Sequence, residues 1–348
     1  MEPQKKRRPG PQRVTLKAVA EAASVSPITV SNVVNGRFRS MSEDTRARVE
    51  AAIARLNYRV NLAARSLKHS QHYTVALIVV DQRPAFLAHP AHHQVAAGLC
   101  NYLNANGYAA VIEGVSPERV EDVSFLDRVS ADALCLIASG SLADRRAMLE
   151  RLQATGQPLV VIHEPPMGSS ARTCHVRSDD CTGGKLLAKH MLARGARQAL
   201  LLLPRRDWAS MDEREKGVKS VFRRVKGASL QTVRVEGLSV EEVGNALHEV
   251  LSRGVMPDAV LAGNDLLAAA AQKYFTQRGY KVPDQVRIGG FGGYDLVQYL
   301  NPTITSIRIP SYAMGQAAGQ ALLQAISTGR FAQHDVLLPV ELVPGEST

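Results

Sequence analysis

The sequence has few cysteines, a single tryptophan and no long apolar run. Its four cysteines, Cys100, Cys135, Cys174 and Cys181, form no CxxC pair and no disulfide-like framework, so we expect free thiols. No stretch approaches the roughly 18 apolar residues of a membrane helix. The basic residues near the start are not followed by an apolar segment, so we expect no secretory signal. These absences argue against a secreted or membrane protein and favour a cytoplasmic one.

Positive charge is in excess, and it is concentrated in the first fifth of the chain. The 348 residues carry a net charge of +10. Residues 1–72 hold 14 Lys or Arg against 5 Asp or Glu, whereas residues 73–348 hold 28 against 27. Such asymmetry indicates that the N-terminal region meets a polyanion. A basic, disordered tail is an alternative for residues 1–13, but not for residues 14–60, where the basic residues lie within patterned helices.

Residues 14–36 predict two short helices around a tight turn. Apolar residues of the first helix recur at helical spacing: Leu16, Val19, Ala20 and Ala23. Ser26 is a suitable N-cap and Pro27 a suitable first residue for the second helix, which Gly36 ends. The second helix would bury three valines: Val30, Val33 and Val34. A strand over residues 28–34 is the alternative, but the cap and the proline argue against it.

A third helix is expected after Ser42, which caps it. Glu43 and Asp44 favour its positive end, and Val49, Ile53 and Leu56 form its inner stripe. Three short helices with a two-helix turn near the start predict a helix-turn-helix DNA-binding domain over residues 14–60.

The exposed face of the second helix would enter the major groove. We expect DNA contacts from Thr15, Ser26, Pro27, Ile28, Thr29, Ser31 and Asn32. An asparagine can bond adenine through two hydrogen bonds, and Ile28 can touch a thymine methyl group. For any one of these residues, an ordinary solvated helix position is the alternative.

Residues 14–36 (VTLKAVAEAASVSPITVSNVVNG) and 45–68 (TRARVEAAIARLNYRVNLAARSLK) closely resemble the N-terminus of LacI/GalR-type bacterial transcriptional regulators. The resemblance implies an N-terminal all-α helix-turn-helix domain plus a two-lobed α/β core like that of periplasmic binding proteins. This sequence departs from the family pattern at Ser24, where members usually have glycine. A left-handed backbone costs serine more than glycine, but we expect the turn to be kept.

Residues 61–72 would then be a hinge helix and linker between the two domains. The resemblance assigns Leu67 to the minor groove, where paired leucines wedge between base steps and kink the duplex. The expected hinge contacts with DNA are Asn61, Ala64, Arg65, Leu67 and Lys68. So short a helix should be frayed in isolation. The alternative is a plain linker with a loosely packed leucine.

From residue 73 to residue 348, strand-like runs alternate with helical ones. Strands are expected at 74–80, 109–114, 133–138, 158–163, 199–203, 231–236, 258–263 and 286–291. Helices are expected near 91–106, 117–129, 144–155, 183–194, 213–226, 241–253 and 266–278. This alternation predicts parallel sheets with helices on both faces, and the number of elements requires two lobes. A ligand would bind in the cleft between the lobes, beyond the carboxyl ends of the strands.

The core lacks the patterns of an enzyme. It has no GxxxxGK[ST], no GxGxxG opening a helix, no HExxH and no GxSxG. His92 and His93 would point apart on a helix, so we expect no metal, and no pattern calls for a cofactor. A transporter's solute-binding protein is the other rival, but it would need a signal peptide and no helix-turn-helix domain.

Five core residues are predicted to line an effector site. The loop after the first strand faces the cleft, so Phe86 and His89 are candidates, with a plain surface loop as the alternative. The resemblance carries over Arg214, three residues before Gly217, as an effector contact; the alternative is a surface charge. It also carries over Asn264 as a polar lining residue, for which a helix N-cap pair with Asp265 is the alternative.

Gly292 is the fifth candidate, in the stretch GFGGYDL (290–296). Relatives that bind neutral sugars commonly carry an aspartate at this position, and the stretch resembles that of gluconate-type regulators. Losing the acid removes an acceptor for a neutral polyol and a repulsive charge for an anion, while Arg205 and Arg206 would add positive potential. We therefore expect a sugar, sugar acid or sugar phosphate, leaning slightly to an anion.

The sequence thus predicts a DNA-binding transcriptional regulator, favoured as a repressor, whose affinity for double-stranded operator DNA is controlled by a small effector. No heptad extension follows residues 336–343, so a homodimer is expected. Both an inducer and a co-repressor fit these residues.

Overall fold

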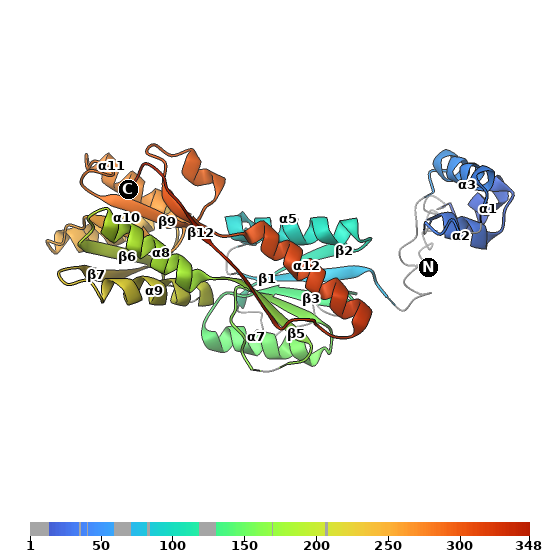
Figure 1. Ribbon diagram of the computed structural model, residues 1–348, viewed down its shortest axis with the longest axis horizontal. Coiled ribbons are helices and arrows are strands. Elements are labelled where there is room, and N and C mark those ends of the chain that lie inside the picture. Colours follow the sequence, from blue (N-terminus) through green and yellow to red (C-terminus); the bar gives the residue numbers. More distant parts are fainter. Residues whose placement is uncertain are drawn as a thin grey trace, which may run out of the picture. The chain divides into compact units, whose positions relative to one another are not determined.

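The computed structural model describes residues 14–34, 36–39, 41–58, 71–81, 84–117, 130–168, 170–205 and 208–348. Several predictions fall outside these residues: the tail 1–13, the hinge contacts Asn61, Ala64, Arg65, Leu67 and Lys68, most of the helix near 117–129, and Arg206. The chain forms two compact units, Met1–His72 and Tyr73–Thr348 (Figure 1).

The N-terminal unit contains three helices: α1 (Leu16–Ala23), α2 (Pro27–Val34) and α3 (Glu43–Arg55). Each begins at a hydroxyl cap. Thr15 Oγ1 accepts from Ala18 N at 3.2 Å, Ser26 Oγ from Thr29 N at 3.1 Å, and Ser42 Oγ from Thr45 N at 3.3 Å. The helices share one small apolar core that includes Val19, Ala20, Ala23, Val30, Val33, Val49 and Ala52.

The turn between α1 and α2 depends on Ser24. Its backbone is left-handed, with φ 54° and ψ 49°, and Val25 N behind it donates to Ala20 O at 3.0 Å. A serine therefore occupies the left-handed conformation that LacI/GalR-type regulators usually give to glycine, and the turn is kept, as expected from the sequence.

The second unit is built on two six-stranded sheets, which we call lobe 1 and lobe 2 (Figure 1). Lobe 1 has the strand order β11-β5-β4-β3-β1-β2, with β1 (Thr74–Val80), β2 (Ala109–Val115), β3 (Ala133–Ile137), β4 (Leu159–Ile162), β5 (Thr173–Ser178) and β11 (Asp335–Leu338). Lobe 2 has the order β12-β10-β9-β8-β6-β7, with β6 (Gln198–Pro204), β7 (Ser229–Val235), β8 (Ala259–Ala262), β9 (Arg287–Gly292), β10 (Thr305–Arg308) and β12 (Glu341–Val343). All strand pairs are parallel except β10 with β12.

Helices cover both faces of each sheet. Lobe 1 is covered by α5 (Pro90–Ala105) and α12 (Ser311–Thr328) on one face and by α7 (Leu142–Ala154) on the other. In lobe 2, α8 (Asp180–Ala193) and α9 (Ala209–Phe222) lie opposite α10 (Val240–Ser252) and α11 (Asp265–Gln277). The central strands are consequently buried on both sides, which explains runs such as TVALIVV.

The chain crosses between the lobes after β5, after β10 and after β11. Lobe 2 therefore begins with α8, and α12 returns to lobe 1. The predicted two-lobed α/β architecture is confirmed. Five elements were not predicted from the sequence: β5, β10, α12, β11 and β12. The missed helix α12 (SYAMGQAAGQALLQAIST) is rich in small residues, so its apolar stripe is weak in the sequence.

Small residues let α12 pack closely on α5. A Cβ on Gly315 would lie 2.1 Å from Val95 O, and one on Gly98 would lie 2.0 Å from Tyr312 O. Within the part of the chain that the structure describes, no helix is both long and apolar enough to span a membrane.

Candidate functional site

The α2 face of the N-terminal unit presents the residues predicted to contact DNA. Ser26, Pro27 and Ile28 are exposed, and Ile28 exposes 73% of its surface, which is unusual for a large apolar side chain. Thr29, Ser31 and Asn32 are partly exposed, and Thr15 is exposed at the start of α1. The structure thus places these residues on the surface of one helix and at the end of its neighbour.

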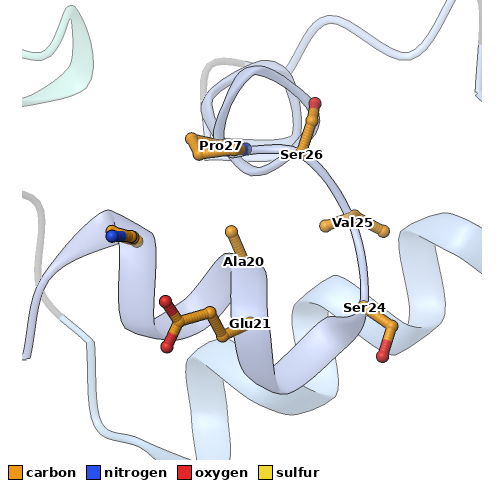
Figure 2. Close-up of a pocket in the computed structure, with 7 residues that line it drawn as sticks. Ala20, Glu21, Ser24, Val25, Ser26 and Pro27 are labelled. Carbon is orange, nitrogen blue, oxygen red and sulfur yellow. The ribbon is translucent and has the colours of Figure 1, made fainter.

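A shallow pocket beside the turn shows how the two helices are held together. Ala20 points from α1 toward the start of α2, while Ser24 and Val25 form the connection and Ser26 and Pro27 open α2 (Figure 2). Ala20 is only 2% exposed, as expected for a small residue where two helices cross closely.

The second unit contains a cavity of about 40 Å³, which we call the interlobe cavity because both lobes line it. Lobe 1 contributes side chains that follow β1, β3 and β4: His89, Ala91, His92, Ala138, His163 and Glu164. Lobe 2 contributes Trp208, Ser210, Met211, Arg214, Asn264 and Tyr294. This is the edge formed by the carboxyl ends of parallel strands, where ligands bind in such sheets.

Three of the five predicted effector residues line this cavity, namely His89, Arg214 and Asn264. The other two, Phe86 and Gly292, are not among the lining residues that the structure describes. Phe86 lies in a short 3₁₀ helix and packs over β2, because a Cβ on Gly114 would lie 2.3 Å from its ring.

Arg214 borders the cavity and also ties three elements of lobe 2 together. Its Nε donates to Asp180 Oδ1 at 2.8 Å, and its Nη1 donates to the Gly263 carbonyl at 2.6 Å. The guanidinium lies 4.0 Å from the centroid of the Phe291 ring. Arg214 is 5% exposed and is therefore not a surface charge. Burial raises the pKa of Asp180, and the Arg214 guanidinium opposes that rise.

Asn264 has two roles in one side chain. Its Oδ1 accepts from Leu267 N at 2.9 Å and caps α11, whereas its buried Nδ2 has no hydrogen-bond partner among the described residues. Asp265 is not the cap, contrary to the alternative considered from the sequence. Its carboxylate accepts from Ser306 Oγ at 2.6 Å and from Tyr294 N at 3.0 Å, and burial raises its pKa.

Gly292 leaves room for an aromatic ring. Its φ of +138° suits only glycine, and a Cβ there would lie 2.3 Å from Cε2 of Tyr294 and 2.9 Å from Oδ2 of Asp265. The ring of Tyr294 lines the cavity instead, and burial raises the pKa of its hydroxyl. The missing acid at position 292 is thus accompanied by an aromatic wall two residues later.

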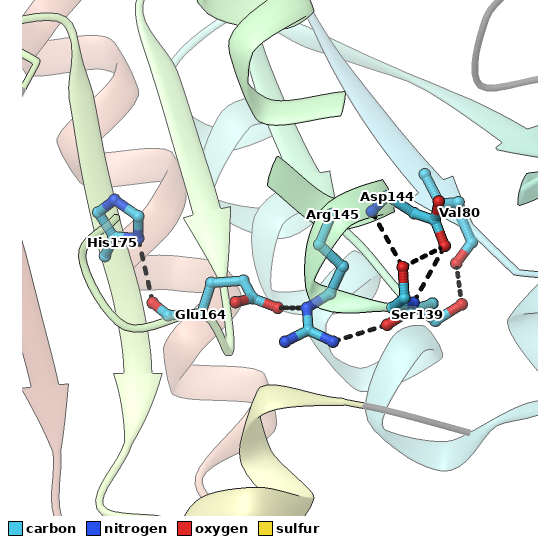
Figure 3. Close-up of polar contacts among 8 residues, drawn as sticks. Val80, Ser139, Asp144, Arg145, Glu164 and His175 are labelled. Carbon is cyan, nitrogen blue, oxygen red and sulfur yellow. Dashed lines mark hydrogen bonds and ion pairs between the residues drawn. The ribbon is translucent and has the colours of Figure 1, made fainter. Parts of the chain in front are cut away.

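Glu164 and Arg145 form a buried ion pair on the lobe 1 side. Arg145 Nε lies 2.6 Å from Glu164 Oε1, and Arg145 Nη1 donates to the Gly140 carbonyl at 2.6 Å (Figure 3). His175 Nδ1 donates to the Glu164 carbonyl at 3.0 Å, which fixes the backbone. Burial raises the pKa of Glu164 to about 7, although Arg145 opposes the rise.

Histidines supply the remaining polar edge of the cavity. His92 Nδ1 lies 2.8 Å from the Phe86 carbonyl and must donate to it, which leaves Nε2 as an acceptor in the neutral ring. His89 Nδ1 accepts from Ala91 N at 3.3 Å, so its Nε2 carries the proton. Burial, followed by the charges of Arg214 and His92, lowers the pKa of His163 to about 3.

His89 also connects the lobes. Its ring packs edge-on against Trp208, 5.6 Å between centroids, and against Tyr294, 6.4 Å between centroids, both from lobe 2. Sequence reasoning missed Trp208, Tyr294, His163 and Glu164. The last two follow β4 immediately, so the rule that singled out Phe86 and His89 after the first strand would also have found them.

The structure also shows the position of two other features singled out in the sequence, Arg205 and the pair His92 and His93. Arg205 pairs with Glu236 at 2.8 Å, and both side chains are 66% exposed, so Arg205 is not a lining residue. His92 is buried and His93 exposed, as their neighbouring positions on a helix predicted. Within the described ranges, no three His, Cys, Asp or Glu side chains are grouped as a metal site.

An N-terminal helix-turn-helix unit joined to a two-lobed core with a polar cavity defines a class, the ligand-responsive DNA-binding regulators. Comparison with known proteins agrees. Residues 15–61 match the family model of bacterial regulatory proteins of the lacI family, and residues 188–348 match the periplasmic binding protein-like domain. The chain therefore combines a lacI-type helix-turn-helix domain with a periplasmic-binding-protein-like domain, and it is similar over nearly its whole length to bacterial transcriptional repressors. It is a DNA-binding regulator and not an enzyme.

Individual relatives match over nearly the whole chain. The ribose operon repressor of Bacillus subtilis (strain 168) is 28% identical over 335 residues, which are 96% of this chain and 98% of that protein. The lac repressor dimer bound to operator and the anti-inducer ONPF has a TM-score of 0.78 at 26% identity, covering 97% of this chain and 99% of its own. A transcriptional regulator CelR–cellobiose complex has a TM-score of 0.70 at 25% identity, covering 97% and 100%.

Proposed function

We propose that this protein is a homodimeric repressor in the cytoplasm and that an effector in the interlobe cavity sets its affinity for operator DNA. The domains would be those expected from the sequence: the tail 1–13, the reader 14–60, the hinge 61–72 and the core 73–348. The lac repressor dimer on its operator supports the dimer and the DNA partner by similarity.

The observation that carries the proposal is the size and lining of the cavity. Its volume is about 40 Å³, whereas sites for small organic molecules span about 300–1,000 Å³. A sugar-sized effector therefore has to displace side chains or move the lobes apart. Because both lobes line the cavity, effector binding is linked to the arrangement of the lobes. Operator DNA is proposed to favour a different arrangement, so each ligand changes the affinity of the other by the same factor.

The proposed effector is a sugar or a sugar derivative. The named relatives support this class, since one is a ribose operon repressor and another was solved with cellobiose. Trp208 and Tyr294 offer aromatic surfaces for a sugar ring, and Asn264 and Glu164 offer polar atoms for its hydroxyl groups.

A gel-shift titration against DNA upstream of the protein's own gene tests the DNA-binding part. We expect a specific complex that weakens steeply with salt, because Lys and Arg displace counterions from phosphates. Equal affinity for a scrambled duplex would contradict the proposal. A thermal-shift screen of sugars, sugar acids and sugar phosphates tests the effector part, with a rise in the melting temperature expected.

A further inference from the structure

Glu164 lines the interlobe cavity and has one carboxylate oxygen without a hydrogen bond among the described residues. The residue lies two positions after the end of β4, is 3% exposed and pairs with Arg145 through Oε1 (Figure 3). Among the described residues, no donor bonds its other oxygen, Oε2, which is buried. A buried acceptor that lacks a donor is costly, so a ligand that supplies one gains affinity.

Asn264 presents the complementary group from the other lobe. It is 2% exposed, and its Oδ1 is used by the helix cap, so only the Nδ2 donor is available to a ligand. A hydroxyl group both donates and accepts, so neighbouring hydroxyls can satisfy Glu164 and Asn264 together. An ionised carboxylate group or a phosphate dianion only accepts hydrogen bonds, so that group can satisfy Asn264 but not Glu164.

The charges around the cavity point the same way. Arg145 is paired with Glu164, and Arg214 is paired with Asp180 at 2.8 Å. Asp212 from lobe 2 adds a further negative charge, which contributes to raising the pKa of Glu164. His163 is neutral near pH 7, because its pKa is lowered to about 3. An anion entering here meets two arginines that are already paired with carboxylates.

We propose that Glu164 determines the charge specificity of the effector site, accepting hydrogen bonds from a neutral polyol and disfavouring the corresponding acid or phosphate. The proposal rests on the function proposed above and names the effector class of the same cavity. Glu164 thereby provides, from lobe 1, the acceptor that is absent at Gly292 in lobe 2. This is opposite to the slight preference for an anion that Gly292, Arg205, Arg206 and the likeness to gluconate-type regulators suggested from the sequence.

The test compares matched probes on the full-length protein. Calorimetry at about pH 8, above the pKa of Glu164, would use D-glucose with D-gluconate, and D-ribose with D-ribose 5-phosphate. The variants are Glu164→Gln, which keeps the shape and removes the charge, and Glu150→Gln as a matched control. Glu150 is an exposed glutamate on α7 in the same lobe.

The wild type should bind a neutral probe more tightly than its anionic counterpart. Glu164→Gln should reduce this preference about 10- to 100-fold, the worth of a hydrogen bond to a charged group, and Glu150→Gln should leave it unchanged. A merely structural role would weaken both probes alike. If Glu164→Gln fails to fold because Arg145 is left unpaired, the double variant Arg145→Gln, Glu164→Gln removes both charges. It should show the same reduced preference for the neutral probe.

Three results would overturn the proposal: tighter wild-type binding of an anionic probe, an unchanged preference in Glu164→Gln, or no binding of either neutral probe. Gel shifts on the same samples keep the two proposals separate. If the protein binds its operator but fails the calorimetric test, only the proposed charge specificity is wrong. If the protein binds no DNA specifically, the proposed function itself is wrong.

Discussion

At the scale of single residues, two side chains that line the cavity use one polar atom in the fold and leave the other without a described partner. Asn264 caps α11 with Oδ1 and has no described partner for Nδ2, and Glu164 pairs with Arg145 through Oε1 and has no described partner for Oε2. Structural and functional interpretations of such residues are therefore not exclusive. Substituting them changes both stability and binding, so isosteric variants are the informative ones.

The stability of the core should depend on pH through His163. The pKa of His163 in the folded state, about 3, lies below its value in the unfolded state. Its contribution to the free energy of unfolding is therefore present above about pH 6.5 and is lost as pH falls toward 3. His163→Asn tolerates the left-handed backbone at this residue, where φ is 66°. Relative to this variant, the free energy of unfolding of the wild type should fall by up to about 1.4 kcal/mol per pH unit below 6.5. Urea titrations at several pH values measure the difference, and a difference independent of pH would contradict it.

Ser24 should carry measurable strain in the helix-turn-helix unit. Ser24→Gly relieves the left-handed backbone and should stabilise the unit by up to about 1 kcal/mol, with operator affinity retained. Ser26→Ala, two residues on, removes the α2 cap and should destabilise it by about 1 kcal/mol. Amide hydrogen exchange of α1 and α2 in the full-length protein reports both effects. Faster exchange in Ser24→Gly would refute the strain.

At the scale of elements, glycine contacts set how closely neighbouring helices lie, and this matters for the cavity. A Cβ on Gly217 in α9 would lie 2.2 Å from Cys181 O in α8, and one on Gly184 would lie 2.4 Å from Arg214 O. Arg214 belongs to α9 and bonds Asp180 at the start of α8, so the spacing of this helix pair positions a cavity residue.

Gly217→Ala should therefore affect both stability and binding. Overpacking against backbone should cost about 1–3 kcal/mol, and ligand affinity should fall because Arg214 shifts with α9. Gly244→Ala in α10 is the matched control, since its new Cβ meets only the edge of the Tyr274 ring at 3.3 Å. It should change stability by less than about 1 kcal/mol. Chemical denaturation of both variants measures the contrast; equal effects would show that helix spacing is not the cause.

Strong local patterns made most of these elements predictable. The caps at Ser26 and Ser42 and the alternation from residue 73 onward predicted the three N-terminal helices and two α/β lobes. The order of strands within each sheet, and helix α12 with its small residues, depend on contacts distant in sequence. The cavity was predictable only in part for the same reason. Its location follows from topology, but Tyr294 enters it because Gly292 and Asp265 shape a loop in three dimensions.

At the scale of the whole molecule, the core is two lobes that meet around one polar cavity, with three chain crossings between them. His89 packs across this boundary against the protein's single tryptophan. A change in lobe arrangement therefore alters the surroundings of Trp208, which gives an intrinsic optical signal.

Ligand entry should change the emission of Trp208. A probe that raises the melting temperature should displace His89 or move lobe 1, and the emission spectrum should shift in proportion to site occupancy. His89→Ala removes the contact and should produce a shift without ligand. Stabilisation of the protein with an unchanged Trp208 spectrum would place the ligand elsewhere.

The most direct test of the account is reciprocal linkage between the two ligands. Operator affinity is measured with and without a saturating effector, and effector affinity is measured from Trp208 emission with and without operator. Coupling through one lobe equilibrium predicts that both affinities change by the same factor, about 5- to 150-fold. An effector that fills the interlobe cavity and leaves operator affinity unchanged would contradict the account.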